Sequence, residues 1–219
     1  MIPVSPMPEP ANFDEMVRSP GRKYLSRHGI RKQGDTAGRR IPWSADKADY
    51  WRRCSAELIQ EYRSICCYVA MKINRDPGEQ DRHTSVEHFV PKSKDPWLAY
   101  EWANYRLASC KANRDRGDRD VLDPFAVEAD DFLLMLATGE IYPNPAISES
   151  RKKVVTETIE NLKLNNPYWR KLRLKYYLFY CQNPHNFDQG EMKAFLRDNA
   201  PIVLAQLKRP IATMIVEED

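Results

Sequence analysis

A block in the middle of the chain constrains the fold more than any other part of the sequence. Ser85–Val90 has the composition of a short strand, Pro96–Trp102 that of one or two helical turns, and Tyr105–Ser109 that of a second strand. Cys110–Arg116 is typical of a short helix, which Gly117 would stop. Strand, short excursion, strand and helix are the order of a ββα unit, and the sequence predicts such a unit here.

Periodicity predicts further helices on both sides of this block. Apolar residues recur at helical spacing after Ser44, so we expect one long helix from Ser44 to about Ile73. Beyond the block, Phe132–Ala137 and Glu140–Tyr142 predict a β-hairpin. Four helix starts follow, at Ser148, Asn166-Pro167, Asp188 and Pro201. The expected fold class is therefore α+β and mainly helical, with a small ββα core between a long N-terminal helix and a C-terminal helical lobe.

The expected organisation has three parts. Residues 1–45 are rich in proline and basic residues and predict an extended basic arm with little regular structure. Residues 46–125 would hold the long helix and the ββα core, and residues 126–219 the hairpin and the helical lobe.

The positive charge is unevenly distributed, although the net charge is only +3. From Arg18 to Arg53 there are eleven Lys and Arg against three Asp, a net of +8, and from Arg151 to Lys175 eight against two Glu, a net of +6. Such clusters fit a phosphate backbone, with Arg39 and Arg40 as candidate contacts in the arm. They fit two solvated helix faces equally well.

Cysteine usage and hydropathy bear on the cellular compartment. The five cysteines, at positions 54, 66, 67, 110 and 181, form no C-x-x-C pair, so we expect free thiols and no four-cysteine zinc site. No stretch approaches the roughly 18 apolar residues of a membrane span, and the N-terminus has no secretory-signal pattern. These features favour a cytoplasmic protein without a membrane partner.

The residues of the ββα block suit phosphodiester hydrolysis. Histidine titrates near neutral pH and can deprotonate a water molecule, which makes His88 a candidate base. A carboxylate and an amide oxygen suit a hard cation such as Mg²⁺. Glu87 and His88 are adjacent on a predicted strand, however, so their side chains point to opposite faces unless the strand is bulged.

Three segments of the block carry a resemblance to a known family. They are Glu87-His88-Phe89-Val90-Pro91-Lys92-Ser93, Trp102-Ala103-Asn104, and Cys110-Lys111-Ala112-Asn113-Arg114. Together they resemble the motif of bacterial HNH endonucleases, which have the ββα-metal fold.

The resemblance implies a role for each matching residue. His88 would be the general base, and Asn104 the residue that stiffens the loop and orients this base. Glu87 and Asn113 would hold one divalent cation, Mg²⁺ or Mn²⁺. Candidate phosphate contacts are Lys92, Arg114 and Arg116.

Each role also has an ordinary structural alternative. His88 would then be a core histidine, Glu87 the partner of a nearby arginine, and Asn113 an amide on a helix surface. His83, five residues before His88, would be a loop residue or a substrate contact.

The chain departs from its relatives in its cysteines. Many HNH proteins of this kind hold the motif together with a zinc ion bound by two C-x-x-C pairs. Here Cys66-Cys67 and a lone Cys110 leave only a remnant, so we expect no structural zinc.

The leading expectation is a metal-dependent HNH endonuclease that hydrolyses DNA. Relatives with this motif occur beside ATPases in antiphage systems of the Septu and retron-linked kind, which implies a defence role. An ATPase of the SMC/ABC kind is the implied protein partner, with self-association as the next choice. The alternatives are an RNase, for instance one cleaving transfer RNA, and a non-catalytic nucleic-acid-binding subunit. The four intact motif residues argue against the last.

Overall fold

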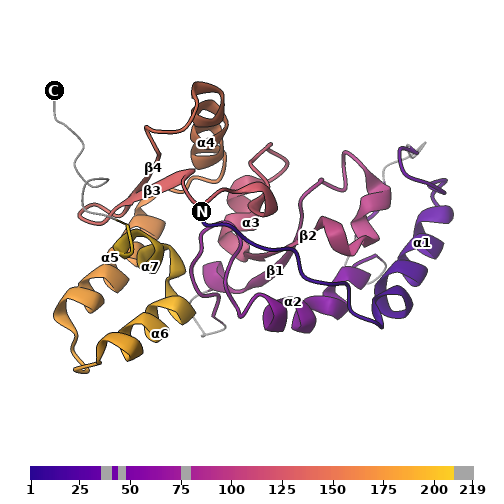
Figure 1. The fold of residues 1–219 in the computed structure, drawn as a ribbon. Helices are drawn as coiled ribbons and strands as arrows, with labels where there is room; N and C mark the ends of the chain where they lie inside the picture. The colour runs from indigo at the N-terminus through magenta and orange to yellow at the C-terminus, as the bar shows by residue number, and fades with distance from the viewer. Residues whose placement is uncertain (36–40, 44–47, 75–79, 210–219) are drawn as a thin grey trace. The chain divides into compact units, whose positions relative to one another are not determined.

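The computed structural model describes residues 1–35, 41–43, 48–74 and 80–209, and the chain forms two compact units (Figure 1). Unit 1 consists of Met1–Val4, Ile65–Lys72 and Arg114–Asp219, and unit 2 of Ser5–Ser64 and Ile73–Asn113. Helices and two small antiparallel sheets make up the structure, which confirms the expected α+β, mainly helical class. These units divide the chain differently from the three parts expected from sequence.

The chain has the predicted ββα order, with both strands and the first residues of the helix in unit 2 and Arg114–Arg116 in unit 1. Strand β1 (Thr84–His88) pairs antiparallel with β2 (Tyr105–Ser109), so that Glu87 lies opposite Arg106 and His88 opposite Tyr105. Two 3-10 turns, η4 (Pro96–Tyr100) and η5 (Trp102–Asn104), lie between the strands, and α3 (Cys110–Arg116) follows β2 directly. A third such turn, η3 (Gln80–Arg82), precedes β1.

The predicted long helix from Ser44 to Ile73 is wrong. Its described part consists of η2 (Tyr50–Cys54) and α2 (Ser55–Glu61), while residues 44–47 lie outside the described residues. The helix ends because Arg63 and Ser64 adopt positive φ angles of 52° and 59°, which no right-handed helix accommodates.

The segment after α2 is a buried loop rather than helix. Each residue from Cys66 to Met71 is at most 2% exposed, and Ile65 forms an isolated bridge with Lys72. The Cys66 amide donates to the Met71 carbonyl (3.0 Å), and the Lys72 amide to the Asn199 carbonyl (2.9 Å). A run that is apolar on every side fits a buried loop as well as a helix, so periodicity alone misassigned it.

The expectation of an extended arm is also wrong for its described part. A short π-helix, η1 (Asp14–Arg18), leads into α1 (Ser19–Ser26), which has Pro20 in its first turn. Proline is tolerated at that place because the first amides of a helix have no helical acceptor. Phe13 is fully buried, and its ring meets those of Trp102 (5.6 Å) and Tyr105 (5.8 Å). Phe13 and α1 therefore belong to unit 2, whereas Met1–Val4 belong to unit 1.

Unit 1 confirms the predicted hairpin and helices. The Ser148, Asn166 and Asp188 side chains cap three helices, and Asp188 forms a capping box with Glu191. Buried Arg173 donates to the carbonyls of Gly139 and Leu164, both at 2.6 Å, and so joins the hairpin turn to the helices. The elements are η6 (Pro124–Ala126), β3 (Phe132–Met135), β4 (Glu140–Pro143), α4 (Glu149–Asn161), α5 (Pro167–Gln182), α6 (Gln189–Asn199) and α7 (Pro201–Leu207).

No helix in the described part of the chain is both long enough and apolar enough to cross a membrane.

Candidate active site

Asn104 holds the loop between β1 and β2 through its side-chain amide. Its Oδ1 accepts from the Val90 amide at 2.7 Å, and its Nδ2 donates to the carbonyls of Val90 (3.1 Å) and Leu98 (3.0 Å). Its own carbonyl accepts from the Phe89 amide at 2.8 Å. Both ends of the loop are thus tied to one residue that is 6% exposed. The Phe89 bond continues the register of β1 and β2 by one residue, and the Val90 amide then leaves the ladder for the Asn104 side chain.

His88 is held in one orientation by this loop. Its Nε2 lies 3.1 Å from the Ala99 carbonyl, and a carbonyl only accepts, so Nε2 carries the proton and Nδ1 the lone pair. The ring stands edge-on to Trp51 (4.8 Å) and Tyr105 (5.2 Å). Burial, together with the charge of Lys92, lowers the pKa of His88 to about 3, against the bond to Ala99, which raises it. The imidazole is therefore neutral at physiological pH, and the burial that disfavours its protonated form also makes it a weak base in this conformation.

Glu87 and His88 point to opposite faces of the hairpin, as strand geometry requires. His88 packs against Trp51 on one face, whereas Glu87 lies opposite Arg106 on the other. Glu87 and Arg106 are each 3% exposed. The structural alternative for Glu87, partnership with a nearby arginine, therefore has Arg106 as its specific candidate.

Asn113 lies over the face that carries Glu87. Its Nδ2 donates to the Ser85 hydroxyl at 2.6 Å, and Ser85 shares a face of β1 with Glu87 because the two are separated by one residue. A carboxylate and an amide are the oxygen donors that Mg²⁺ accepts with water completing its shell. The donor types of this pair suit one hard divalent cation, which would lie on the face of the hairpin opposite His88. Within the described ranges, no group of three or more His, Cys, Asp or Glu side chains forms a metal site.

A polar pocket lies wholly within unit 2 and is lined by Lys92 and Asn113, but by neither Glu87 nor His88, which are 3% and 7% exposed. Its volume is about 760 Å³. Trp51 and Lys92, which lie beside His88, form part of the wall, and Asn113 and Ser85 form another part. The full lining is Trp43, Asp49, Trp51, Arg52, Ser55, His83, Thr84, Ser85, Val86, Lys92, Cys110 and Asn113.

The predicted phosphate contacts differ in their surroundings. Lys92 lines the pocket, with its Nζ 4.2 Å from the centre of the Trp51 ring. Arg114 is exposed but belongs to unit 1. Arg116 is 1% exposed, donates to the Arg119 carbonyl and lies against the Tyr68 ring, so its predicted phosphate contact is wrong for this conformation. Arg39 and Arg40 lie outside the described residues.

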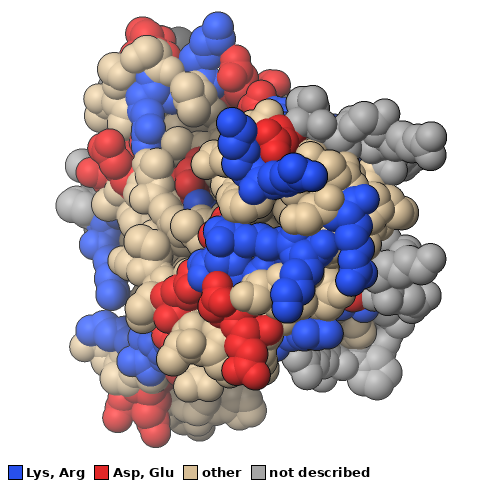
Figure 2. Space-filling model, turned by 90° about the vertical axis from the view of Figure 1, so that its right-hand side faces the viewer, with Lys and Arg blue, Asp and Glu red and all other residues tan. Residues whose placement is uncertain are grey.

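Acidic partners offset much of the charge around α1. Arg18 pairs with Glu9 and, at 3.1 Å, with Glu101, while Arg22 pairs with Glu101 at 2.8 Å. Figure 2, viewed from the side of α1, shows Lys and Arg side chains in a band bordered by Asp and Glu. Glu9 and Glu101 both lie outside residues 18–53, so the net charge of +8 counted for that segment does not include them. The predicted basic arm is therefore in part an ion-paired surface.

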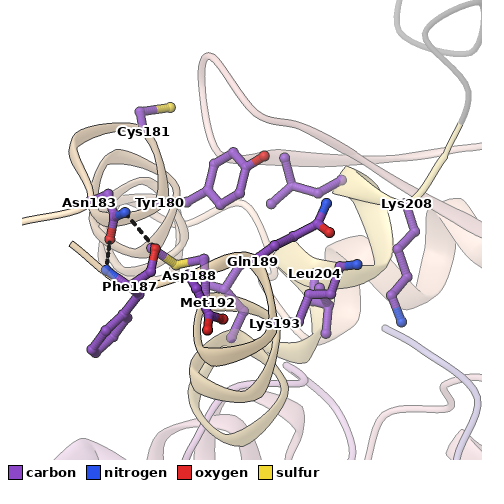
Figure 3. Close-up of a pocket in the computed structure, with 12 residues that line it drawn as sticks. Tyr180, Cys181, Asn183, Phe187, Asp188, Gln189, Met192, Lys193, Leu204 and Lys208 are labelled. Carbon is purple, nitrogen blue, oxygen red and sulfur yellow. Dashed lines mark hydrogen bonds between the residues drawn. The ribbon is translucent and has the colours of Figure 1, made fainter. Parts of the chain in front are cut away.

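A second pocket, of about 460 Å³, lies in unit 1 among α5, α6 and α7. Figure 3 shows Tyr180, Met192 and Leu204 around it, with Asn183 bonded twice to the backbone of Phe187 at 2.9 Å. It contains none of the predicted site residues, so the pocket beside His88 is the candidate site.

Sequence reasoning missed several residues of this site. Trp43 falls in the predicted arm and Trp51 in the predicted long helix, and the sequence did not predict these two, Ser85 or Ala99 as site residues. Trp51 carried no usable signal, because it lies far before the Glu87-His88 motif in the sequence. The Ala99 carbonyl carries no sequence signal, because every residue has one. His83, an open case from sequence, lines the pocket.

Neither a protein-family model nor a curated protein matches this chain.

Proposed function

We propose that this protein is a metal-dependent nuclease of the HNH type that hydrolyses phosphodiester bonds of DNA. One observation carries the proposal: Asn104 ties down the loop at Leu98, and the next carbonyl in that loop, Ala99, holds Nε2 of His88. This arrangement is what the resemblance requires of a structural asparagine and a general base.

The chemistry assigned to the residues follows from their environment. His88, neutral and with its tautomer set by Ala99, would take the proton of the attacking water on Nδ1. The Ala99 carbonyl would also stabilise the imidazolium that forms, because the Nε2–H bond to it strengthens with positive charge. Lys92 would attract the phosphate at the pocket wall.

Glu87 and Asn113 would hold the divalent cation, Mg²⁺ or Mn²⁺. When bound, such an ion stabilises charge on a phosphate oxygen and on the leaving oxygen. No structural zinc is proposed: Cys66 and Cys67 are buried in unit 1, whereas Cys110, in unit 2, lies 3.6 Å from the Thr84 carbonyl.

A cleavage assay tests the function. Wild type, His88→Asn and His185→Ala are incubated with plasmid DNA, single-stranded DNA and RNA in Mg²⁺, Mn²⁺ or EDTA. We expect metal-dependent DNA cleavage that falls about 10²- to 10⁴-fold in His88→Asn, since a general base contributes about that factor. The exposed His185 controls for loss of a histidine as such.

Asparagine is chosen because alanine would leave a hole between Trp51 and Tyr105. Full turnover by a folded His88→Asn protein would remove His88 from the mechanism. Cleavage of RNA alone would favour the RNase alternative, and cleavage of no substrate by wild type would favour the non-catalytic one.

We further propose that the chain acts in the cytoplasm as the nuclease of an antiphage complex, with an ATPase of the SMC/ABC kind as its partner. The C-terminal lobe supports this, because Leu178 and Tyr180 on α5 are 51% and 41% exposed. They lie two residues apart in one turn of α5, so they expose apolar surface on two sides of this helix. The N-terminal arm gives no such support, since Phe13 is buried in unit 2.

A further inference from the structure

The pocket beside His88 combines an aromatic wall, a held cation and a polar wall, which suits a nucleotide. We propose that it binds one unpaired nucleotide of the nucleic-acid strand, with the base against Trp43 and the phosphate at Lys92. This names the substrate class of the proposed nuclease and rests on that proposed function.

Trp43 is a fixed and partly exposed ring. Its centroid lies 6.1 Å from that of Trp51, 6.3 Å from Tyr100 and 6.5 Å from Tyr24. The Tyr24 hydroxyl also bonds to the carbonyl of Pro42, the preceding residue. Aromatic neighbours and this bond hold the indole at the pocket wall, where it is only half-buried. A rigid ring presented in this way can stack with a base of any kind.

Lys92 brings a positive charge to the same wall. Its Nζ lies 4.2 Å from the Trp51 centroid and 5.7 Å from that of Trp43. Attraction between the ammonium group and the faces of the two rings favours this position. A phosphate bound by Lys92 would therefore lie within one nucleotide of a base stacked on Trp43.

The remaining wall can form hydrogen bonds with a base or a sugar. Asp49, Ser55 and His83 all line the pocket, and together they offer both donors and acceptors. Arg52, also in the lining, pairs with Asp49 at 3.2 Å. A wall with both hydrogen-bond donors and acceptors distinguishes this pocket from a groove that binds a phosphate backbone through Lys and Arg charges alone.

Size and stacking favour an unpaired nucleotide over a duplex. A volume of about 760 Å³ lies within the range of about 300–1,000 Å³ typical of small-molecule sites. A base inside a duplex is stacked on both faces and cannot offer one to Trp43, whereas an unpaired or extruded base can. Trp51 lies against His88, and Asn113 lines the pocket, so the bound nucleotide would adjoin the proposed catalytic residues.

Binding without cleavage tests the pocket. Fluorescence anisotropy is measured in EDTA with the full chain and an end-labelled single-stranded DNA, the same sequence as RNA, and the DNA duplex. We expect Trp43→Ala to weaken single-strand binding about 5- to 100-fold, the range for loss of one base–aromatic stack, with little change for duplex. Trp43→Phe, which keeps a ring, should retain most of the affinity. The DNA and RNA arms identify which strand the pocket takes.

Lys92→Ala provides a second readout that does not depend on Trp43→Ala folding. It should lower the log–log salt dependence of single-strand binding by about 0.7, the value for one phosphate contact. Lys94→Ala, an exposed lysine of the same loop, should leave the slope unchanged.

Three results would each contradict the proposed nucleotide pocket. They are an equal loss of single-strand affinity in Trp43→Phe and Trp43→Ala, an equal loss of affinity for duplex and single-stranded DNA, and an unchanged salt slope in Lys92→Ala. A chain that binds as described but cleaves nothing would contradict the nuclease proposal and leave the pocket standing. A chain that cleaves, yet binds single strands equally well after Trp43→Ala, would contradict the pocket alone.

Discussion

At the scale of single residues, the loop of the site depends on the Asn104 amide. This side chain accepts a hydrogen bond from the Val90 amide and donates to the carbonyls of Val90 and Leu98. No other side-chain type of this size both accepts one bond and donates two. The residue that the motif identifies for catalysis is thus also a structural element of unit 2.

Asn104→Ala should destabilise the protein as well as impair cleavage. It leaves three backbone groups without partners, and each such group costs up to about 1–3 kcal/mol when fully buried. Val90 and Leu98 are only partly buried, so water can replace some of these bonds, and we expect the free energy of unfolding to fall by about 2–4 kcal/mol. Urea denaturation followed by circular dichroism measures this change. Asn12→Ala, at an exposed asparagine, should stay within about 0.5 kcal/mol of wild type. A stability equal to that of wild type would show that the loop does not need the amide.

At the scale of elements, α1 is shaped by its contact with η4. A Cβ atom at Gly21 would overlap the ring of Tyr100, which is fully buried and donates its hydroxyl hydrogen to the Ala48 carbonyl at 2.7 Å. The Tyr100 ring also lies 5.9 Å from that of Trp51, so it has little room to move. The glycine allows the helix backbone to approach the aromatic cluster behind the site.

Gly21→Ala should therefore destabilise, although alanine is favoured over glycine by about 1 kcal/mol in a helix interior. We expect a loss of about 1–3 kcal/mol, the usual range for overpacking a filled core. Thermal unfolding compares it with Lys23→Ala, an exposed position of the same helix, which should be nearly neutral. A gain in stability for Gly21→Ala would show that α1 can move away from Tyr100.

At the scale of the whole molecule, the proposed partner would contact the exposed apolar residues of α5. A Leu178→Ser, Tyr180→Ser double variant should fold normally, because exposed substitutions change stability by about 0.5 kcal/mol or less. In size-exclusion chromatography with light scattering, the double variant should no longer co-elute with the co-expressed ATPase that we propose as the partner. Val154→Ser, at a residue of α4 that is 40% exposed, is the matched control. A monodisperse 25.6 kDa monomer that is fully active and does not bind the ATPase would contradict the partner proposal.

Local signals in the sequence determined much of the fold. The caps at Ser148, Asn166 and Asp188 act within one helical turn, so the starts of α4, α5 and α6 were predictable. The ββα order was also predicted from short local segments, namely Ser85–Val90, Tyr105–Ser109 and Cys110–Arg116, the last of which Gly117 follows. The opposite facing of Glu87 and His88 follows from alternation along one strand.

Only the tertiary structure decided the rest. Cys66–Met71 is a continuous apolar run, and such a run can be buried on every side either as a helix or as a loop. The sequence of this segment alone therefore does not decide between the two. The packing of the arm depends on Trp102 and Tyr105, which contact Phe13 although it lies about ninety positions earlier in the chain. His88 has its orientation from the Ala99 carbonyl, a backbone group identical in every residue. Such partners are selected by the packing of distant segments, so local sequence preferences cannot reveal them.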